Sequence, residues 1–475
     1  MLFNSSHFAF FFVVVTTLYF LLPHRFRWIL LLGSSCYFYM AFIPVYILIL
    51  GFTIVIDYFA GIFLEDTKGK RRKYWLIASL IANIGVLAVF KYYNFLNNNL
   101  SEFLITFGYH NTVPNLSIIL PIGLSFHTFQ AMSYTIEVYR GHQKAERHFG
   151  IYALYVMFYP QLVAGPIERP QNLLHQFYEK HYFEYERIIE GLKMMLWGLF
   201  MKLVIADRLA IYVNTVYNHA GQHSGKTLAL ATILFAFQIY CDFAGYSNIA
   251  IGAAKVMGFK LMTNFNRPYF SHSISEFWKR WHISLSTWFR DYLYISLGGN
   301  RVSVPRWYIN LLLVFTISGL WHGANWTYII WGAINGFYLV FAVVTEKWRK
   351  NISKFILLDR VPKINNAVQI LITFVLTCFA WVFFRANSAS QAFYIVKSII
   401  AFKGPLFVDA PQLIYGAFAI LFLLLIELRL EYWHHSPLPF KSKYRIAEQS
   451  AYVVLIVILL TVGVFDGSQF IYFQF

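Results

Sequence analysis

The sequence is short of charged residues and of cysteine. Only 13% of its 475 residues are charged, whereas soluble domains usually contain about 25%. Its three cysteines lie apart in apolar surroundings without a CxxC pair, so we expect neither a disulfide framework nor a metal site. Walker, GxGxxG, HExxH and GxSxG motifs are absent, so ATP-driven transport, dinucleotide redox chemistry, zinc proteolysis and serine-hydrolase chemistry lack their motifs.

Apolar sequence is abundant instead. Hydrophobic residues make up 58% of the chain and aromatic residues 20%, and apolar runs long enough to cross a bilayer recur from end to end. These runs predict an all-α polytopic membrane protein, with about eleven transmembrane helices plus re-entrant and short cytoplasmic helices around a central cavity. The first run, Phe8 to Leu22, has no preceding cation and no small-residue cleavage site, so we expect a retained span.

The formal net charge is +17, but lysine and arginine sit in short clusters between the apolar runs. Such clusters mark cytoplasmic loops and do not indicate nucleic-acid binding. The strongest cluster, residues 68–73, has five cations in six positions. Fixing it in the cytoplasm predicts that both termini, including residues 467–475, lie outside. The excess charge would also attract an anionic donor or anionic lipid headgroups.

We expect one membrane domain over residues 1–475. It is divided into N-terminal spans (1–136), a catalytic core (137–345) and C-terminal spans (346–475). In the later part of the core the apolar stretches become short and cations become frequent, which favours short, partly re-entrant helices that face the cytoplasm.

The stretch Ser318–Trp326 places His322 between two apolar runs whose far ends are both basic. If both ends are cytoplasmic, the segment is a hairpin with His322 near its bend. As a helix, Trp307 to Leu320 is about 21 Å long, shorter than the roughly 30 Å hydrocarbon core. We therefore expect His322 to lie within the membrane thickness.

Histidine inside a membrane is rare and costly, so a functional interpretation of His322 is favoured over a structural one. Gly319 and Gly323 would leave backbone room for a ligand. A neutral imidazole can take a proton from a hydroxyl or a thiol, or act as the nucleophile, and the sequence leaves both roles open. Asn325 could orient the ring or donate to an oxyanion, or it could be a turn residue.

The segment Ser275–Asp291 is dense in ionisable and aromatic groups. As one helix it would place Trp278 and His282 on one face and Arg280 and Ser284 on another, which indicates packing in protein or a wet cavity. A functional role is favoured for His282, while snorkelling at the interface is an equal alternative for the cations at 279 and 280. The candidate donor- or substrate-binding residues of this segment are Trp278, Arg280, Trp281, Ser284, Arg290 and Asp291.

Asp242 is a carboxylate within an apolar span. We expect it to pair with a cation of the nearby cytoplasmic block and to help shape a donor site. Asp207 and Arg208 are adjacent and so face apart, which predicts a separate partner for each.

A series of short segments appears in a characteristic order. They are Pro160–Pro166, Asp242–Ser247, Asn264–Pro268, Phe277–Trp288, Arg290–Ile295, Gly298–Arg301 and Gly319–Trp326. Together they resemble the membrane-bound O-acyltransferase family in its bacterial alginate O-acetyltransferase branch, which includes peptidoglycan O-acetylation proteins and, more distantly, teichoic acid D-alanyl transfer proteins. Residues 470–475 are also similar to the ends of this branch.

The resemblance implies acyl transfer across the bacterial cytoplasmic membrane. It identifies His322 with the family's membrane-embedded histidine and His282 with its second histidine. The implied donor is a thioester, acetyl-coenzyme A or an acyl carrier protein, with no permanently bound cofactor. The implied acceptor is a polysaccharide, reached through an extracytoplasmic partner, often an SGNH-type acetyltransferase, because the chain has no such soluble domain.

Two interpretations from other classes remain. One is an acyl-group or lipid transporter or flippase, which predicts inverted repeats that the sequence does not show. The other is a non-catalytic scaffold of a polysaccharide export complex.

Overall fold

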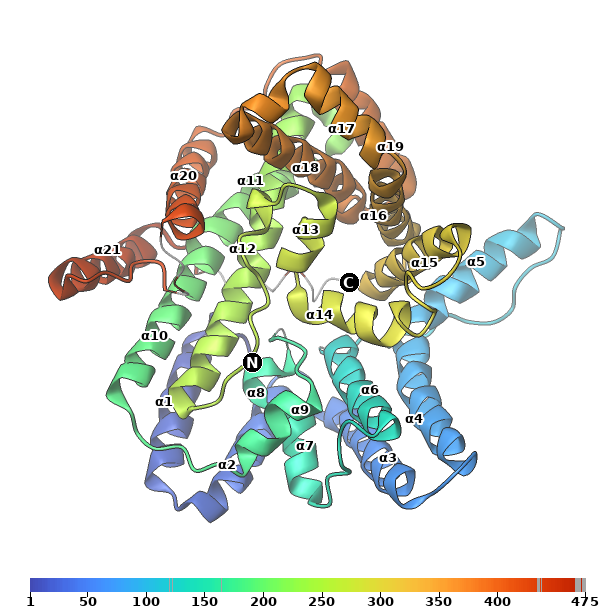
Figure 1. Cartoon of the computed structure of the whole chain (residues 1–475), viewed down its shortest axis with the longest axis vertical. Helices are drawn as coiled ribbons and strands as arrows, with labels where there is room; N and C mark the ends of the chain where they lie inside the picture. Colours follow the sequence, from blue (N-terminus) through green and yellow to red (C-terminus); the bar gives the residue numbers. More distant parts are fainter. Residues whose placement is uncertain are drawn as a thin grey trace. The chain divides into compact units, whose positions relative to one another are not determined.

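The computed structural model describes residues 1–118, 120–121, 123–163, 165–433, 436, 438–465 and 471. Helices are the only regular elements in these ranges (Figure 1), which confirms the all-α prediction. The expectations for residues 467–475 fall, apart from Ile471, outside the described residues.

Two compact units divide the chain. The first contains residues 1–195 and 248–262, and the second contains residues 196–247 and 263–475. The boundaries fall near the end of α10 (Tyr185–Leu199) and inside α12 (Gly225–Met257). This division differs from the three segments expected from the sequence, which stay a prediction.

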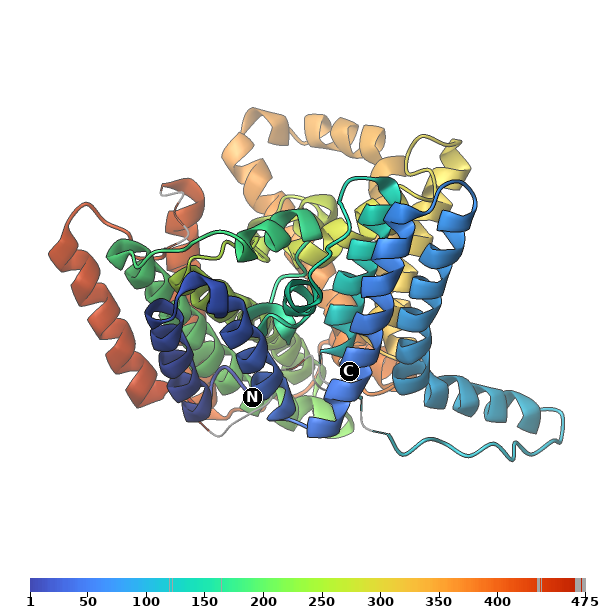
Figure 2. The same cartoon turned by 90° about the horizontal axis from the view of Figure 1, so that it is seen from below.

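The first unit contains the N-terminal helices. They are α1 (Ser6–Leu21), α2 (His24–Met40), α3 (Ile47–Asp66), α4 (Arg71–Leu87), α5 (Tyr93–Ile105), α6 (Leu124–Arg140), α7 (Phe149–Met157), α8 (Tyr159–Leu162) and α9 (Pro170–Leu173). Figure 2 shows α3, α4 and α6 side by side. Buried Asp57 of α3 accepts hydrogen bonds from Ser79 Oγ (2.6 Å) and Asn83 Nδ2 (2.8 Å) of α4. These bonds satisfy a carboxyl group that could not stay unpaired away from water.

The second unit carries the candidate site. Its helices are α11 (Asp207–Asn218), α13 (Ile274–Arg280), α14 (Ile283–Trp288), α15 (Val304–His322), α16 (Trp326–Val344), α17 (Glu346–Phe355), α18 (Pro362–Arg385), α19 (Ala389–Ala401), α20 (Ala410–Tyr432) and α21 (Arg445–Val462). A π-helical turn, Phe200–Ala206, precedes α11. Wide turns of this kind turn side chains away from the regular helical register.

Seven described helical segments are long and apolar enough to cross a membrane. They are Pro44–Asp66, Arg71–Ile105, Gly225–Met257, Trp326–Val344, Pro362–Arg385, Ala410–Tyr432 and Arg445–Val462. The chain is therefore a multi-pass membrane protein, with fewer such helices than the eleven crossings expected. Some expected crossings are shorter: α1 has 16 residues, about 24 Å of helix. The π-helical turn lies between α10 and α11, and that segment is not among the seven.

The α15–α16 hairpin confirms the prediction made from its basic flanks. A Cβ atom at Gly319 would lie 2.2 Å from the carbonyl oxygen of Tyr328, and one at Gly332 would lie 2.3 Å from that of Phe315. Only glycine allows the two backbones to come this close. A Cβ atom at Gly323 would also overlap the Tyr328 ring. The expectation that these glycines leave room for a ligand is thus wrong, because the facing helix occupies that room.

Candidate active site

His322 is the last residue of α15, and its ring is buried among aromatic side chains. Its centroid lies 5.1 Å from that of Trp331 on α16 and 5.6 Å from that of Phe384 on α18, and both contacts are edge-on. The helix ends here because Gly323 is extended and the chain turns at once into α16. Packing from two further helices therefore fixes the imidazole.

Asn325 begins the second arm of the hairpin. Its Oδ1 accepts a hydrogen bond from the backbone N–H of Thr327 at 3.0 Å, and its Nδ2 donates to the carbonyl of Asn387 at 3.4 Å. This is the geometry of a helix N-cap, for which asparagine is among the best residues. The structure places Asn325 in the turn role that the sequence left open.

The segment that carries His282 is not one continuous helix, contrary to the expectation. The α-helix stops at Arg280, His282 adopts a left-handed conformation (φ 43°, ψ 55°), and α14 begins at Ile283. Two backbone bonds from a distant segment bridge the break: Asn266 N–H donates to Arg280 O and Ile283 N–H donates to Asn264 O, both at 2.9 Å. These bonds replace intrahelical ones and help offset the strain of a non-glycine residue at positive φ.

Asn264 organises the polar groups at this break. Its Oδ1 accepts from Ser284 Oγ at 2.9 Å and lies 3.1 Å from Nδ1 of His282, while its Nδ2 donates to Ser247 Oγ at 3.1 Å. An amide oxygen can only accept a hydrogen bond, so Nδ1 of His282 must carry the ring proton. Nε2 is then the basic nitrogen of the ring. Asn264 was not among the site residues predicted from the sequence, although it begins the segment Asn264–Pro268 quoted above.

Burial holds the pKa of His282 well below its usual range, and the neighbouring His322 lowers it further. The cause is the loss of solvation for the charged imidazolium. His282 is therefore a neutral base at physiological pH.

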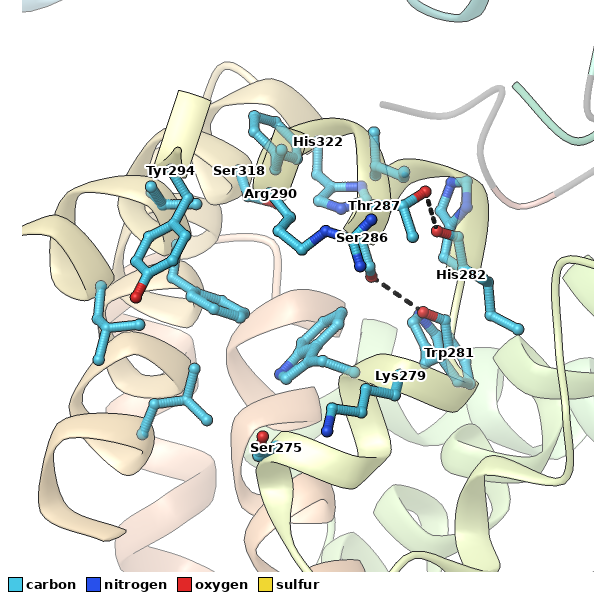
Figure 3. A pocket seen from close by; sticks show the side chains of 18 residues that line it. Ser275, Lys279, Trp281, His282, Ser286, Thr287, Arg290, Tyr294, Ser318 and His322 are labelled. Carbon is cyan, nitrogen blue, oxygen red and sulfur yellow. Dashed lines mark hydrogen bonds between the residues drawn. The ribbon is translucent and has the colours of Figure 1, made fainter. Parts of the chain in front are cut away.

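A cavity of 350 Å³ brings both histidines together (Figure 3). Of the predicted site residues, Trp278, Trp281, His282, Arg290 and His322 line it. Its other polar lining residues are Ser275, Lys279, Ser286, Thr287, Tyr294 and Ser318. The remaining lining is apolar and aromatic, which is typical of a small-molecule site with a few orienting polar groups.

Trp278 supplies an unusual group to this wall. It packs edge-on against Trp331, with 5.7 Å between ring centroids. Within the described part of the chain its buried indole N–H has no hydrogen-bond acceptor. A buried donor without an acceptor is unfavourable by about 1–3 kcal/mol.

The other predicted residues are not among those that line the cavity. Arg280 makes ion pairs with Glu276 (2.6 Å) and Glu431 (2.9 Å). Asp291 accepts from Nε of the lining residue Arg290 at 2.7 Å. Ser284 is bound to Asn264, as described above. The cationic side chains at the cavity are thus those of Lys279 and Arg290.

Asp242 has a partner different from the one expected. Lys202, from the π-helical turn, lies 2.5 Å from Asp242 and 2.7 Å from Asp207, and all three are buried. The prediction of a cation from the cytoplasmic block is wrong, because the π-helical turn brings a lysine from 40 residues earlier in the sequence. The second oxygen of Asp242 accepts from the backbone N–H of Ile471 at 2.7 Å.

The separate partners expected for Asp207 and Arg208 are confirmed. Asp207 pairs with Lys202, whereas Arg208 donates to the carbonyl of Val462 and stacks over the ring of Tyr415. Within the described residues, no three metal-binding side chains come together.

A sequence profile of the membrane-bound O-acyltransferase family matches residues 140–385, which contain both histidines and every residue that lines the cavity. The chain belongs to this family. The resemblance found in the sequence is confirmed, and the protein is an acyltransferase.

Several bacterial relatives extend the similarity of this acyltransferase beyond the matched region. "Probable alginate O-acetylase AlgI" of Pseudomonas aeruginosa is 39% identical over 405 residues, which cover 85% of this chain and 75% of the relative. "Peptidoglycan O-acetyltransferase" of Helicobacter pylori is 36% identical, with coverages of 85% and 80%. "Teichoic acid D-alanyltransferase" of Bacillus subtilis is 29% identical, with coverages of 58% and 71%.

Proposed function

We propose that this acyltransferase moves an acyl group, most favourably acetyl, from a cytoplasmic thioester across the membrane for O-acetylation of an exported or cell-wall polysaccharide. An alginate-type polymer is favoured, because five of the similar proteins are named probable alginate O-acetylases. The observation that carries the proposal is the meeting of His282 and His322 in one cavity. Residues 137–345 form the catalytic core in this proposal.

The donor is acetyl-coenzyme A or an acyl carrier protein. Both bear phosphate, and Lys279 and Arg290 give the cavity two cations to attract it. The indole N–H of Trp278 would donate to the thioester carbonyl oxygen, whose negative charge grows as the carbonyl is attacked. This arrangement uses a buried donor for which the described protein offers no acceptor.

His322 acts on the acceptor hydroxyl. As a general base it takes the hydroxyl proton while the oxygen attacks the carbonyl carbon; the carbon–sulfur bond breaks and the proton passes to the departing thiolate. As a nucleophile it would first form an acyl-imidazole and release the thiol, after which the hydroxyl takes the acyl group. Each route yields one ester and one thiol.

The acceptor side completes the proposal. We place the protein in the bacterial cytoplasmic membrane with both termini outside, where an extracytoplasmic SGNH-type acetyltransferase passes the acyl group to the polysaccharide. Such a partner would make this chain the step that crosses the membrane.

The test is the O-acetyl content of cell-surface glycans, measured by mass spectrometry. Cells that express the His322→Ala variant should lose O-acetyl groups from one polymer, while the variant still inserts into the membrane and retains its partner. Unchanged acetylation in that variant would refute the proposal. Loss of acetylation from a polymer other than alginate would correct only the acceptor.

A further inference from the structure

Helix α17 is exposed on every face. It follows α16, which ends at Val344, and precedes α18, which begins at Pro362 (Figure 1). Both neighbours are candidate membrane spans, so the ten residues of α17 connect two helices at one surface of the bilayer. None of these ten residues is buried in the protein.

One face of α17 is apolar. Trp348, Ile352 and Phe355 follow one another at spacings of four and three residues and therefore share a face. Trp348 is 62% exposed and Phe355 is 87% exposed, and exposed Ile356 and Leu357 continue the apolar surface. Large side chains like these, side by side on a helix that contains charged residues, are typical of a helix that lies in a membrane interface.

The opposite faces are strongly basic. Residues 346–363 contain six cations and two acids, a net charge of +4. Glu346 pairs with Lys350 at 2.6 Å, and Arg349 bends back to the carbonyl of Ala342 at 2.7 Å. The exposed cations that remain are Lys347, Lys354, Arg360 and Lys363.

We propose that α17 is an interfacial helix that binds anionic phospholipid headgroups through its lysines while its apolar face enters the acyl-chain boundary. Lipid is the occupant favoured by the connection to α16 and α18, because both ends of the segment are held at the bilayer surface. An acidic protein bound to the apolar face would first have to displace that lipid. This inference does not depend on the acyl-transfer proposal.

The first experiment counts the lipids that remain bound to the full-length protein. Protein from nanodiscs that contain phosphatidylglycerol and phosphatidylcholine is analysed by native mass spectrometry, as wild type and as Lys347→Gln/Lys354→Gln. Each lysine near an anionic surface contributes about fivefold in affinity, so retention of phosphatidylglycerol over phosphatidylcholine should fall at least tenfold.

A matched variant, Lys68→Gln/Lys70→Gln, removes two exposed cations from another loop. It should retain more phosphatidylglycerol than the α17 variant. Equal losses in the two variants would show a bulk charge effect and overturn the proposal, as would unchanged retention in the α17 variant.

Hydrogen exchange tests the apolar face. In nanodiscs with phosphatidylglycerol, the amides of residues 346–355 should exchange slowly, and Trp348→Ser/Phe355→Ser should make them exchange several-fold faster. The amides of the α13–α14 segment serve as the folding control, and their exchange should be the same in both proteins. Protection of α17 that requires an added acidic carrier protein, and not phosphatidylglycerol, would assign the surface to that protein and refute the lipid proposal.

Discussion

The two histidines reach one cavity by opposite means. His322 stands at a helix end and is held by edge-on contacts with Trp331 and Phe384. His282 stands in a broken helix, in a left-handed conformation, and is held by the amide oxygen of Asn264. Packing restricts where a ring lies, whereas a hydrogen bond also decides which nitrogen carries the proton. In the proposed reaction the two imidazoles take different parts.

The largest difference should come from replacing each histidine by glutamine. Removal of a general base lowers rates by about 10²–10⁴-fold, so His322→Gln should reduce acyl transfer by at least a hundredfold. His282→Gln should reduce it less, because His322 and not His282 takes the hydroxyl proton in the proposed reaction. Transfer rates from isolated membranes with the partner present measure both, and equal losses would assign both histidines to the proton transfer.

Lys202→Met should have the next largest effect, on stability. It leaves the buried carboxyl groups of Asp207 and Asp242 without their cation, which should lower the free energy of unfolding by about 3–5 kcal/mol. Phe243, next to Asp242, packs against His282 with 4.5 Å between the ring centroids. The loss of packing around Asp242 should therefore affect His282 before it affects His322. Thermal unfolding in detergent measures it, and Lys202→Met/Asp242→Asn should recover part of the loss. An additive further loss in the double variant would contradict the pairing.

Asn264→Asp should change the pH dependence. A carboxylate beside Nδ1 favours the imidazolium form and so raises the pKa of His282. If neutral His282 is needed, the acid limb of the pH–rate profile should move to higher pH, whereas Asn264→Ala should lower stability by about 1–3 kcal/mol without that shift. An unmoved acid limb in Asn264→Asp would show that another group controls it.

The native protein should also lose stability in acid on account of His282. Its pKa in the folded state is depressed, whereas the unfolded value is about 6.5. The unfolded chain therefore binds more protons below about pH 6.5, and the free energy of unfolding falls as the pH decreases through that value. His282→Gln should flatten this dependence in unfolding experiments between pH 7 and pH 5.

Trp278→Phe tests the wall beside His322. The ring contact with Trp331 is largely kept and only the N–H is lost, so stability should stay equal or rise, because a buried donor without an acceptor is removed. If the N–H serves the substrate carbonyl, the turnover number should fall about tenfold or more. Unchanged turnover would remove Trp278 from the proposed mechanism.

The smallest effects should be changes in the KM for the donor, and these should differ between Arg290 and Arg280. Arg290 lines the cavity, so Arg290→Gln should raise the KM for the donor several-fold. Arg280 is paired with two carboxylates outside the cavity, so Arg280→Gln should leave KM unchanged. Steady-state kinetics against donor concentration decide between them, and a raised KM in Arg280→Gln would restore its predicted role in donor binding.

The sequence could predict the surroundings of His322 but not those of His282. The hairpin with His322 was predictable because apolar runs and basic flanks are local signals. The break at His282 was not, because residues 275–291 read as one helix and the bonds that bridge the break come from Asn264 and Asn266. The pairing of Asp242 with Lys202 likewise depends on a π-helical turn, for which the apolar pattern gives no signal. The sequence also does not show that the backbone of α16 fills the space beside Gly319, because this depends on how closely the two helices pack.

The close glycine contact between α15 and α16 fixes where His322 lies relative to the facing helix of the hairpin. Because Gly319 and Gly332 bring backbone against backbone, neither helix can slide along the other without a clash. The imidazole is thus positioned by protein packing and not by the thickness of the surrounding lipid. In bilayers with longer or shorter acyl chains, the hairpin should tilt or the bilayer should change its thickness around it. The distance between His322 and its aromatic neighbours should stay constant.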